Sequence, residues 1–207
     1  MISILLIGIV FSGIIGCGSD EEKPDELSEE KSASQPTLLK EDLLGTWEVV
    51  SINGLTSEAF LKSPEGEDVK EVVIKITQFH FVFLADDSWT INLEFESISN
   101  FPDNPPDPGV VLPDGKLDIT GVWSGTYNID TALTFLTQKA DVNLTSDPQD
   151  FIEKVTGGLT EEEAEVDFAQ QFIDNLLIPF KVSTGALRGN ELTLITSAAK
   201  KMVLEKQ

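Results

Sequence analysis

Few side chains in this 207-residue sequence could carry out chemistry of their own, and the most conspicuous is its single cysteine. Cys17 directly follows Gly16, at the end of a largely apolar run that begins at Ile2. A small residue at the end of a hydrophobic run of about 7–15 residues is typical of a secretory cleavage site, whereas a spanning helix needs about 20 apolar residues. We therefore expect residues 1–16 to be a signal peptide.

The four residues Ile14-Ile15-Gly16-Cys17 resemble the lipobox of bacterial lipoproteins. The resemblance implies that Cys17 is acylated, becomes the first residue of the mature protein and attaches it to the lipid bilayer of the bacterial cell envelope. Gly18 follows the cysteine where an aspartate would favour retention in the inner membrane, so the same resemblance favours the outer membrane. The alternative is an ordinary secretory peptide cut nearby, with no role for Cys17.

The remaining reactive side chains do not form a recognisable catalytic or metal-binding set. His80 is the only histidine, and no cysteine other than Cys17 exists to complete a triad, a disulfide or a CxxC site. Carboxylates are abundant, but no pair of them is singled out by spacing. We therefore expect no enzyme activity, no catalytic residues, no metal site and no cofactor.

Charge separates a tether from a folded domain and excludes several partners. Residues 17–37 are acidic and nearly free of apolar side chains, a composition typical of a disordered linker. The net charge of −22 argues against nucleic-acid binding, which needs a basic face, and favours a soluble monomer through self-repulsion. Residues 38–207, roughly 170 residues, are enough for one domain.

Alternating apolar residues predict that this domain is built mainly from half-buried strands. Apolar positions alternate over 72–76 and, on the opposite parity, over 79–83, so a bulge or turn is expected at Thr77-Gln78. A hairpin turn is expected at 86–88. Further strand segments are expected at 43–50, 89–95, 116–129, 132–135, 140–144, 180–187, 191–196 and 201–205.

Glycines on one strand and a predicted helix indicate how these strands are arranged. Gly121 and Gly125 share a face with Trp123 and Tyr127, and missing side chains allow a strand to curve or a ring to lie over it. Residues 160–177 predict one helix, because Thr160 has capping-box spacing and an apolar stripe follows. We expect an all-β, mainly antiparallel barrel with this helix packed on the sheet.

Four segments together resemble bacterial lipocalin-like domains. The opening strand carries Gly45-Thr46-Trp47, and residues 83–89, 121–127 and 187–194 are similar to later strands and hairpins of that family, in the same order. The resemblance implies an up-and-down β-barrel of about eight strands. The expected helix before the last strands departs from the family, in which a helix follows the barrel. Asp87 stands where the family has a turn glycine.

In that family the opening tryptophan closes one end of the barrel beneath a basic side chain. The resemblance gives Gly45 and Trp47 this structural role, with Lys200, Lys201 and Lys206 as possible covering residues.

The interior of such a barrel either holds a ligand or is filled by its own side chains. The residues expected to line it are Phe81, Phe83, Trp89, Ile91, Leu93, Trp123 and Tyr127. We expect a small apolar ligand there; the alternative is a non-catalytic envelope or surface module with a filled barrel. The proline- and aspartate-rich loop over 100–115 is expected to be solvated, or to lie at the barrel mouth.

Overall fold

The computed structural model describes residues 38–62, 71–101, 113–129, 133–177, 182–196 and 201–207. The expected signal peptide, Cys17 and the tether lie outside the described residues, as do Lys200 and residues 102–112 of the proline-rich loop.

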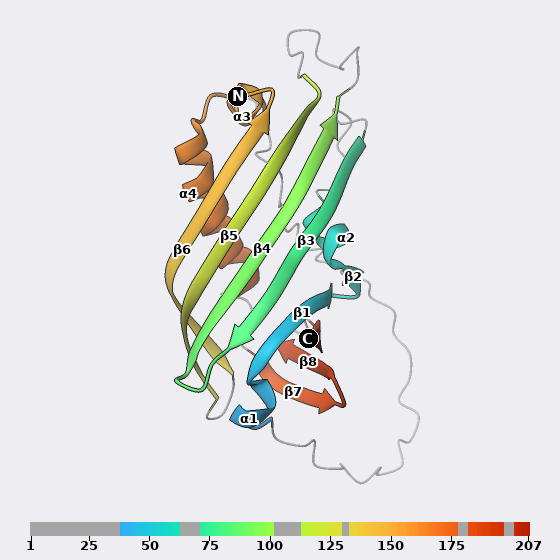
Figure 1. Cartoon of the computed structure of the whole chain (residues 1–207), viewed down its shortest axis with the longest axis vertical. Helices are drawn as coiled ribbons and strands as arrows, with labels where there is room; N and C mark the ends of the chain where they lie inside the picture. The colour runs from blue at the N-terminus through green and yellow to red at the C-terminus, as the bar shows by residue number, and fades with distance from the viewer. Residues whose placement is uncertain (1–37, 63–70, 102–112, 130–132, 178–181, 197–200) are drawn as a thin grey trace, which may run out of the picture.

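Nine strands are found in the described part of the chain, and they pair antiparallel throughout. Their bounds are β1 (Gly45–Ile52), β2 (Leu55–Thr56), β3 (Glu71–Phe83), β4 (Ser88–Asn100), β5 (Gly115–Asn128), β6 (Thr134–Asp147), β7 (Val182–Arg188), β8 (Glu191–Thr196) and β9 (Lys201–Lys206). They form one sheet in the order β6-β5-β4-β3-β1-β9-β8-β7, with β2 beside β1 (Figure 1). The expected all-β, mainly antiparallel class is confirmed.

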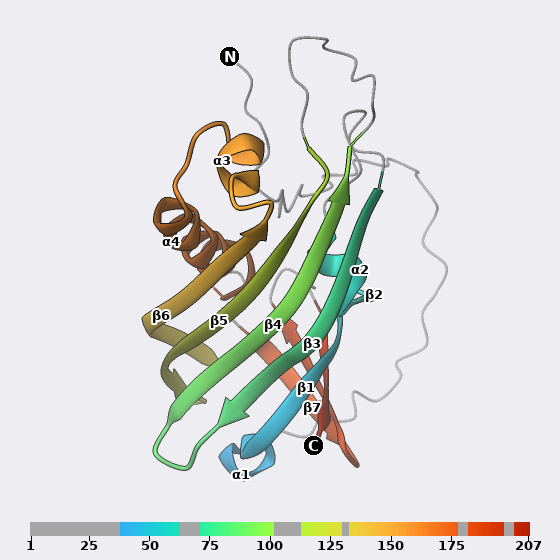
Figure 2. The ribbon, with the colours of Figure 1, turned by 45° about the horizontal axis from the view of Figure 1, so that its top comes forward.

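Closure of the sheet into a barrel is not confirmed. The first and last strands do pair, because β1 lies between β3 and β9. However, β6 and β7 remain at the two ends of the strand order and are not paired with each other in the described residues. The chain between them is helical instead, and its helices lie beside β5 and β6 in both views (Figures 1 and 2).

The expected helix is present, and three short ones accompany it. Helix α4 (Glu161–Phe172) begins with the predicted capping box at Thr160 and continues as a π-helix, η1 (Ile173–Leu177). The unpredicted helices are α1 (Lys40–Leu43), α2 (Ser57–Leu61) and α3 (Phe151–Thr156), each too short to display a helical period in the sequence. None of the described helices is both long and apolar enough to cross a membrane.

Local irregularities of the long strands fall where the sequence pattern changes parity. The β3–β4 register shifts between Ile76 and Gln78, which confirms the expected bulge. The turn after Phe83 ends at Asp87, whose φ of 65° is a conformation that favours glycine but that aspartate also tolerates. Residues 132–147 differ from expectation, because the two separate segments are one long strand, β6, with a register shift opposite Ser124 and Gly125.

Candidate functional site

The seven residues expected to line the interior lie on the apolar face of the sheet. They come from β3 (Phe81, Phe83), β4 (Trp89, Ile91, Leu93) and β5 (Trp123, Tyr127), and none is more than 4% exposed. All of them belong to one hydrophobic core that also includes residues of β1, β8, β9 and α4. The predicted choice of buried face is therefore confirmed, and the rings divide into two clusters.

The first group, here called the end cluster, lies next to the β3–β4 turn. Phe81 stacks on Phe83 with ring centroids 5.8 Å apart, and Tyr127 meets Phe83 edge-on at 5.4 Å. Phe135 of β6 joins them at 6.0 Å from Phe81 and meets the edge of Trp89 at 5.8 Å. Tilted and edge-on pairs at these separations are the favourable arrangements of aromatic rings, so the end cluster is a packed unit.

The second group, the helix cluster, joins β5 to α4. Trp123 stacks on Phe172 with centroids 4.0 Å apart and planes 21° apart, and lies 6.3 Å from Phe168. Its indole passes over Gly121, where an added Cβ would come within 2.3 Å of the Trp123 ring. The glycine thus lets the ring lie flat on the strand, as the sequence predicted, and Phe172 covers its other face.

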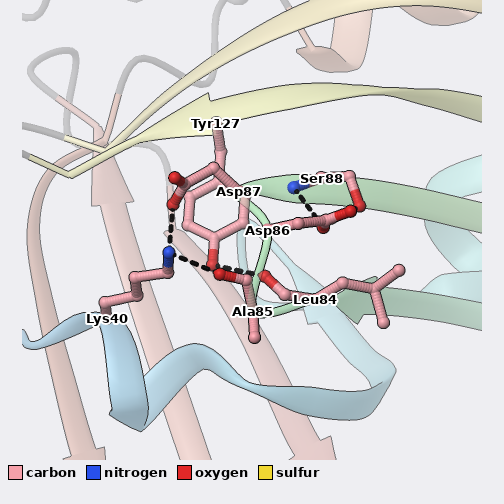
Figure 3. Close-up of polar contacts among 7 residues, drawn as sticks. All are labelled: Lys40, Leu84, Ala85, Asp86, Asp87, Ser88 and Tyr127. Carbon is pink, nitrogen blue, oxygen red and sulfur yellow. Dashed lines mark hydrogen bonds and ion pairs between the residues drawn. The ribbon is translucent and has the colours of Figure 1, made fainter.

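Polar atoms of the buried rings find backbone partners. Trp89 Nε1 donates to the carbonyl of Thr126 at 3.0 Å, and Trp123 Nε1 donates to that of Ala169 at 3.3 Å. The Tyr127 hydroxyl donates to the carbonyl of Leu84 at 3.1 Å (Figure 3). Burial raises the pKa of the Tyr127 phenol, so the group stays protonated and keeps donating at neutral pH.

Glu165 attaches α4 to the edge of the sheet. Its Oε1 accepts from the backbone N–H of Leu144 at 2.9 Å and from the Asn143 side-chain amide at 3.3 Å. Because β6 is an edge strand, its outward N–H groups have no neighbouring strand to pair with. Glu165 satisfies one of them and holds α4 where a further strand would otherwise continue the sheet.

Trp47 of β1 is fully buried and is contacted from both sides of its sequence. Its Nε1 donates to the carbonyl of Leu43, and Lys206 Nζ lies 5.2 Å from the ring centroid. Of Lys201 and Lys206, the two candidates within the described residues, Lys206 is the one found over the ring. Gly45, with a φ of 123°, begins β1 in a conformation that favours glycine.

His80 faces away from the buried phenylalanines of β3, as expected. It is partly exposed, and its Nδ1 lies 3.2 Å from the Gln78 side-chain amide nitrogen. Within the described ranges, no group of three His, Cys, Asp or Glu side chains is placed to hold a metal ion.

Sequence reasoning left three aromatic residues out of the interior set. Phe79 and Phe95 lie on the expected face but contact the helix residues Phe172 and Phe168, at 6.3 and 6.2 Å. Phe135 lies in a segment with weak alternation, so its contact with Trp89 follows from the register of β5 and β6 rather than from the local sequence.

Comparison with known proteins gives no match for this sequence, either among protein-family models or among curated proteins.

Proposed function

We propose that this chain is a lipid-anchored, lipocalin-like protein of the bacterial cell envelope that has no catalytic activity. The lipobox-like residues 14–17 support the anchor at Cys17, and Gly18 supports the outer membrane as its destination. The lipocalin-like assignment rests above all on one observation: Lys206 covers Trp47 where the first and last strands pair, just after Gly45. On this proposal, α4 takes the position in an incomplete barrel that a further strand pairing would occupy.

For the interior, the contacts favour a barrel filled by its own side chains. The ring centroids of Trp123 and Phe172 are 4.0 Å apart, which is van der Waals contact between stacked rings. The end cluster is packed in the same way around Phe83. The protein then serves as a structural or interaction module held at the membrane, as a monomer that does not bind nucleic acid.

A small apolar ligand in the interior is the second candidate, and the position of α4 favours it. Phe168 and Phe172 belong to a helix, so a ligand could displace them from Trp123 without breaking any pairing between strands. Glu165 fixes the helix only to the edge of β6. The ligand would then lie between α4 and the row of rings on β3, β4 and β5.

The anchor is tested by Cys17→Ser in the full chain expressed in a bacterium that processes lipoproteins. We expect the variant to be lost from the membrane fraction, because without an acylated cysteine it carries no lipid chain that could hold it on the bilayer. Ser19→Ala, two residues away, is the matched control and should stay with the membrane. A Cys17→Ser chain that remains membrane-bound without acylation would overturn the anchor.

The two interior candidates are separated by native mass spectrometry of protein purified from its own host. A filled barrel gives the mass of the lipidated chain alone and no saturable binding of an apolar dye. A container gives a co-purified mass and saturable one-to-one dye binding accompanied by a change in tryptophan emission, because Trp123 would touch the ligand. The second result would overturn the filled barrel.

A further inference from the structure

Residues 38–43, here called the N-terminal strap, cross the end of the molecule at which the β3–β4 turn lies (Figures 1 and 2). At one end of the strap, Leu38 lies over Gly185 of β7, where an added Cβ would come within 2.7 Å of Leu38 Cδ2. Further along, Lys40 donates to the carbonyl of Ala85 at 2.7 Å and forms an ion pair with Asp87 (Figure 3). The strap therefore links an edge strand of the sheet to a hairpin turn four strands away in the strand order.

The strap also fixes the residue that closes this end of the interior. Leu43 is fully buried, and its carbonyl accepts the indole N–H of Trp47. Trp47 is also held by burial in the core and by Lys206 of β9, neither of which depends on the strap. Displacement of the strap would thus remove the hydrogen-bond acceptor of the indole while the strand pairing stayed intact.

Apart from the buried Leu43, the contacts that hold the strap are weaker in kind than those that hold α4. The side chains of Lys40 and Asp87 are 35% and 56% exposed, and an ion pair so exposed contributes little to stability. A four-residue helix such as α1 is too short to persist by itself. By contrast, α4 buries Ala164, Phe168 and Phe172 against the sheet.

We propose that the strap opens as a local unit, without unfolding of the sheet, and that its opening removes the backbone acceptor of the Trp47 indole while Trp47 stays in its strand. Lys40 holds the strap in its closed position, because its single ammonium group contacts both the carbonyl of Ala85 and the carboxylate of Asp87.

Hydrogen exchange measured by mass spectrometry on the full chain tests the strap. Lys40→Met keeps the apolar stem but removes both contacts of the ammonium group. We expect exchange of peptides over 38–44 and 84–87 to be at least about fivefold faster, with unchanged exchange over β1, α4 and β8. Lys139→Met removes another exposed ion pair, with Asp141 on β6, and should leave all of these peptides unchanged.

A second variant, Asp87→Asn, removes only the ion pair, since asparagine also adopts a positive φ and Lys40 keeps its bond to Ala85. We expect a smaller acceleration confined to the same peptides. The proposal is overturned if both variants exchange like the wild type, or if strap and α4 accelerate together, which would mean global loosening. The same comparison in the Cys17→Ser background should give the same result, so a failed anchor would not be mistaken for a failed strap.

Discussion

Lys206 lies over Trp47, with Nζ 5.2 Å from the ring centroid, and this contact joins the last strand of the domain to the first. A Cβ added at Gly45 would stand 3.4 Å from Lys206 Cε, which is ordinary contact, so the φ of 123° and not lack of space favours glycine there. The cation lies on the outer side of a tryptophan that is itself fully buried. A contact of this kind stabilises the pairing of β1 with β9.

Lys206→Met should lower the free energy of unfolding by about 0.5–1 kcal/mol, the size of an exposed cation–π contact. The methionine keeps most of the apolar cover over the ring, so the loss reports on the charge. Urea unfolding followed by circular dichroism measures it. Lys201→Met, on the same strand, should leave the free energy of unfolding within about 0.5 kcal/mol; an equal loss in both variants would contradict the specific role of Lys206.

Thr160→Ala should destabilise the protein by about 1 kcal/mol, because it removes the N-cap of α4. In the structure, Thr160 Oγ1 accepts from the backbone N–H of Glu163, and the Glu163 carboxylate accepts from the backbone N–H of Thr160. The Thr160 hydroxyl also donates to this carboxylate, and the two hydrogen bonds that the carboxylate accepts, the backbone one first, lower the pKa of Glu163. Thr160→Ser keeps the hydroxyl and should restore nearly all of the stability in the same urea experiment. A Ser variant as unstable as the Ala variant would show that the methyl group matters and the cap does not.

The strands could be predicted because one face of each is buried and the other is wet. Because of this contrast, apolar residues recur at every second position of a strand, and the bulge at Thr77 shifts these apolar positions by one residue. Closure was not predictable in the same way. Whether β6 pairs with β7 depends on the segment between them, and a capped helix such as α4 gives no local sign of which strands it will separate.

The aromatic face was predicted, but not what covers it. Alternation fixed the side on which Trp123 lies, and Gly121 indicated that a large ring could lie flat there. The partner ring, Phe172, is distant in sequence and lies on a helix, whereas Trp123 lies on a strand. Its stacking on Trp123 therefore depends on the tertiary arrangement and could not be predicted from local sequence. The same limitation applied to α1, whose four residues carry no period but place Lys40 against Asp87.

Phe172→Ala should distinguish a filled interior from a container. If the interior is filled, removing the ring that stacks on Trp123 leaves a cavity and costs about 3–5 kcal/mol in the free energy of unfolding. Urea unfolding measures the loss, and the matched control Val166→Ala, at an exposed position of the same helix, should cost less than about 0.5 kcal/mol. A loss below about 1 kcal/mol, together with altered dye affinity, would instead favour a container in which Phe172 is a movable cover.

Acid should weaken the domain partly through Glu96. Lys116 Nζ lies 2.7 Å and Lys75 Nζ 2.8 Å from its two carboxylate oxygens, and these hydrogen bonds, Lys116 first, lower the pKa of Glu96 to about 2 from an ordinary 4.5. A carboxylate with a depressed pKa in the folded state stabilises the fold fully above its unfolded pKa, and that stabilisation is lost as the pH falls toward the folded value. The window is therefore between about pH 4.5 and about pH 2.

Glu96→Gln should show a flatter dependence of the urea midpoint on pH across that window than the wild type, at low ionic strength. Added salt should reduce the difference, because the pair lies at the surface and is screened. The net charge of −22 has the opposite effect on stability in every variant, because protonation at low pH relieves repulsion among the carboxylates. The comparison therefore needs a variant that removes the same charge at another position. Glu94→Gln, exposed on the same strand, removes the same charge and should follow the wild-type slope. If both glutamine variants flatten the curve equally, overall charge controls the acid response and the Lys116–Glu96–Lys75 network does not.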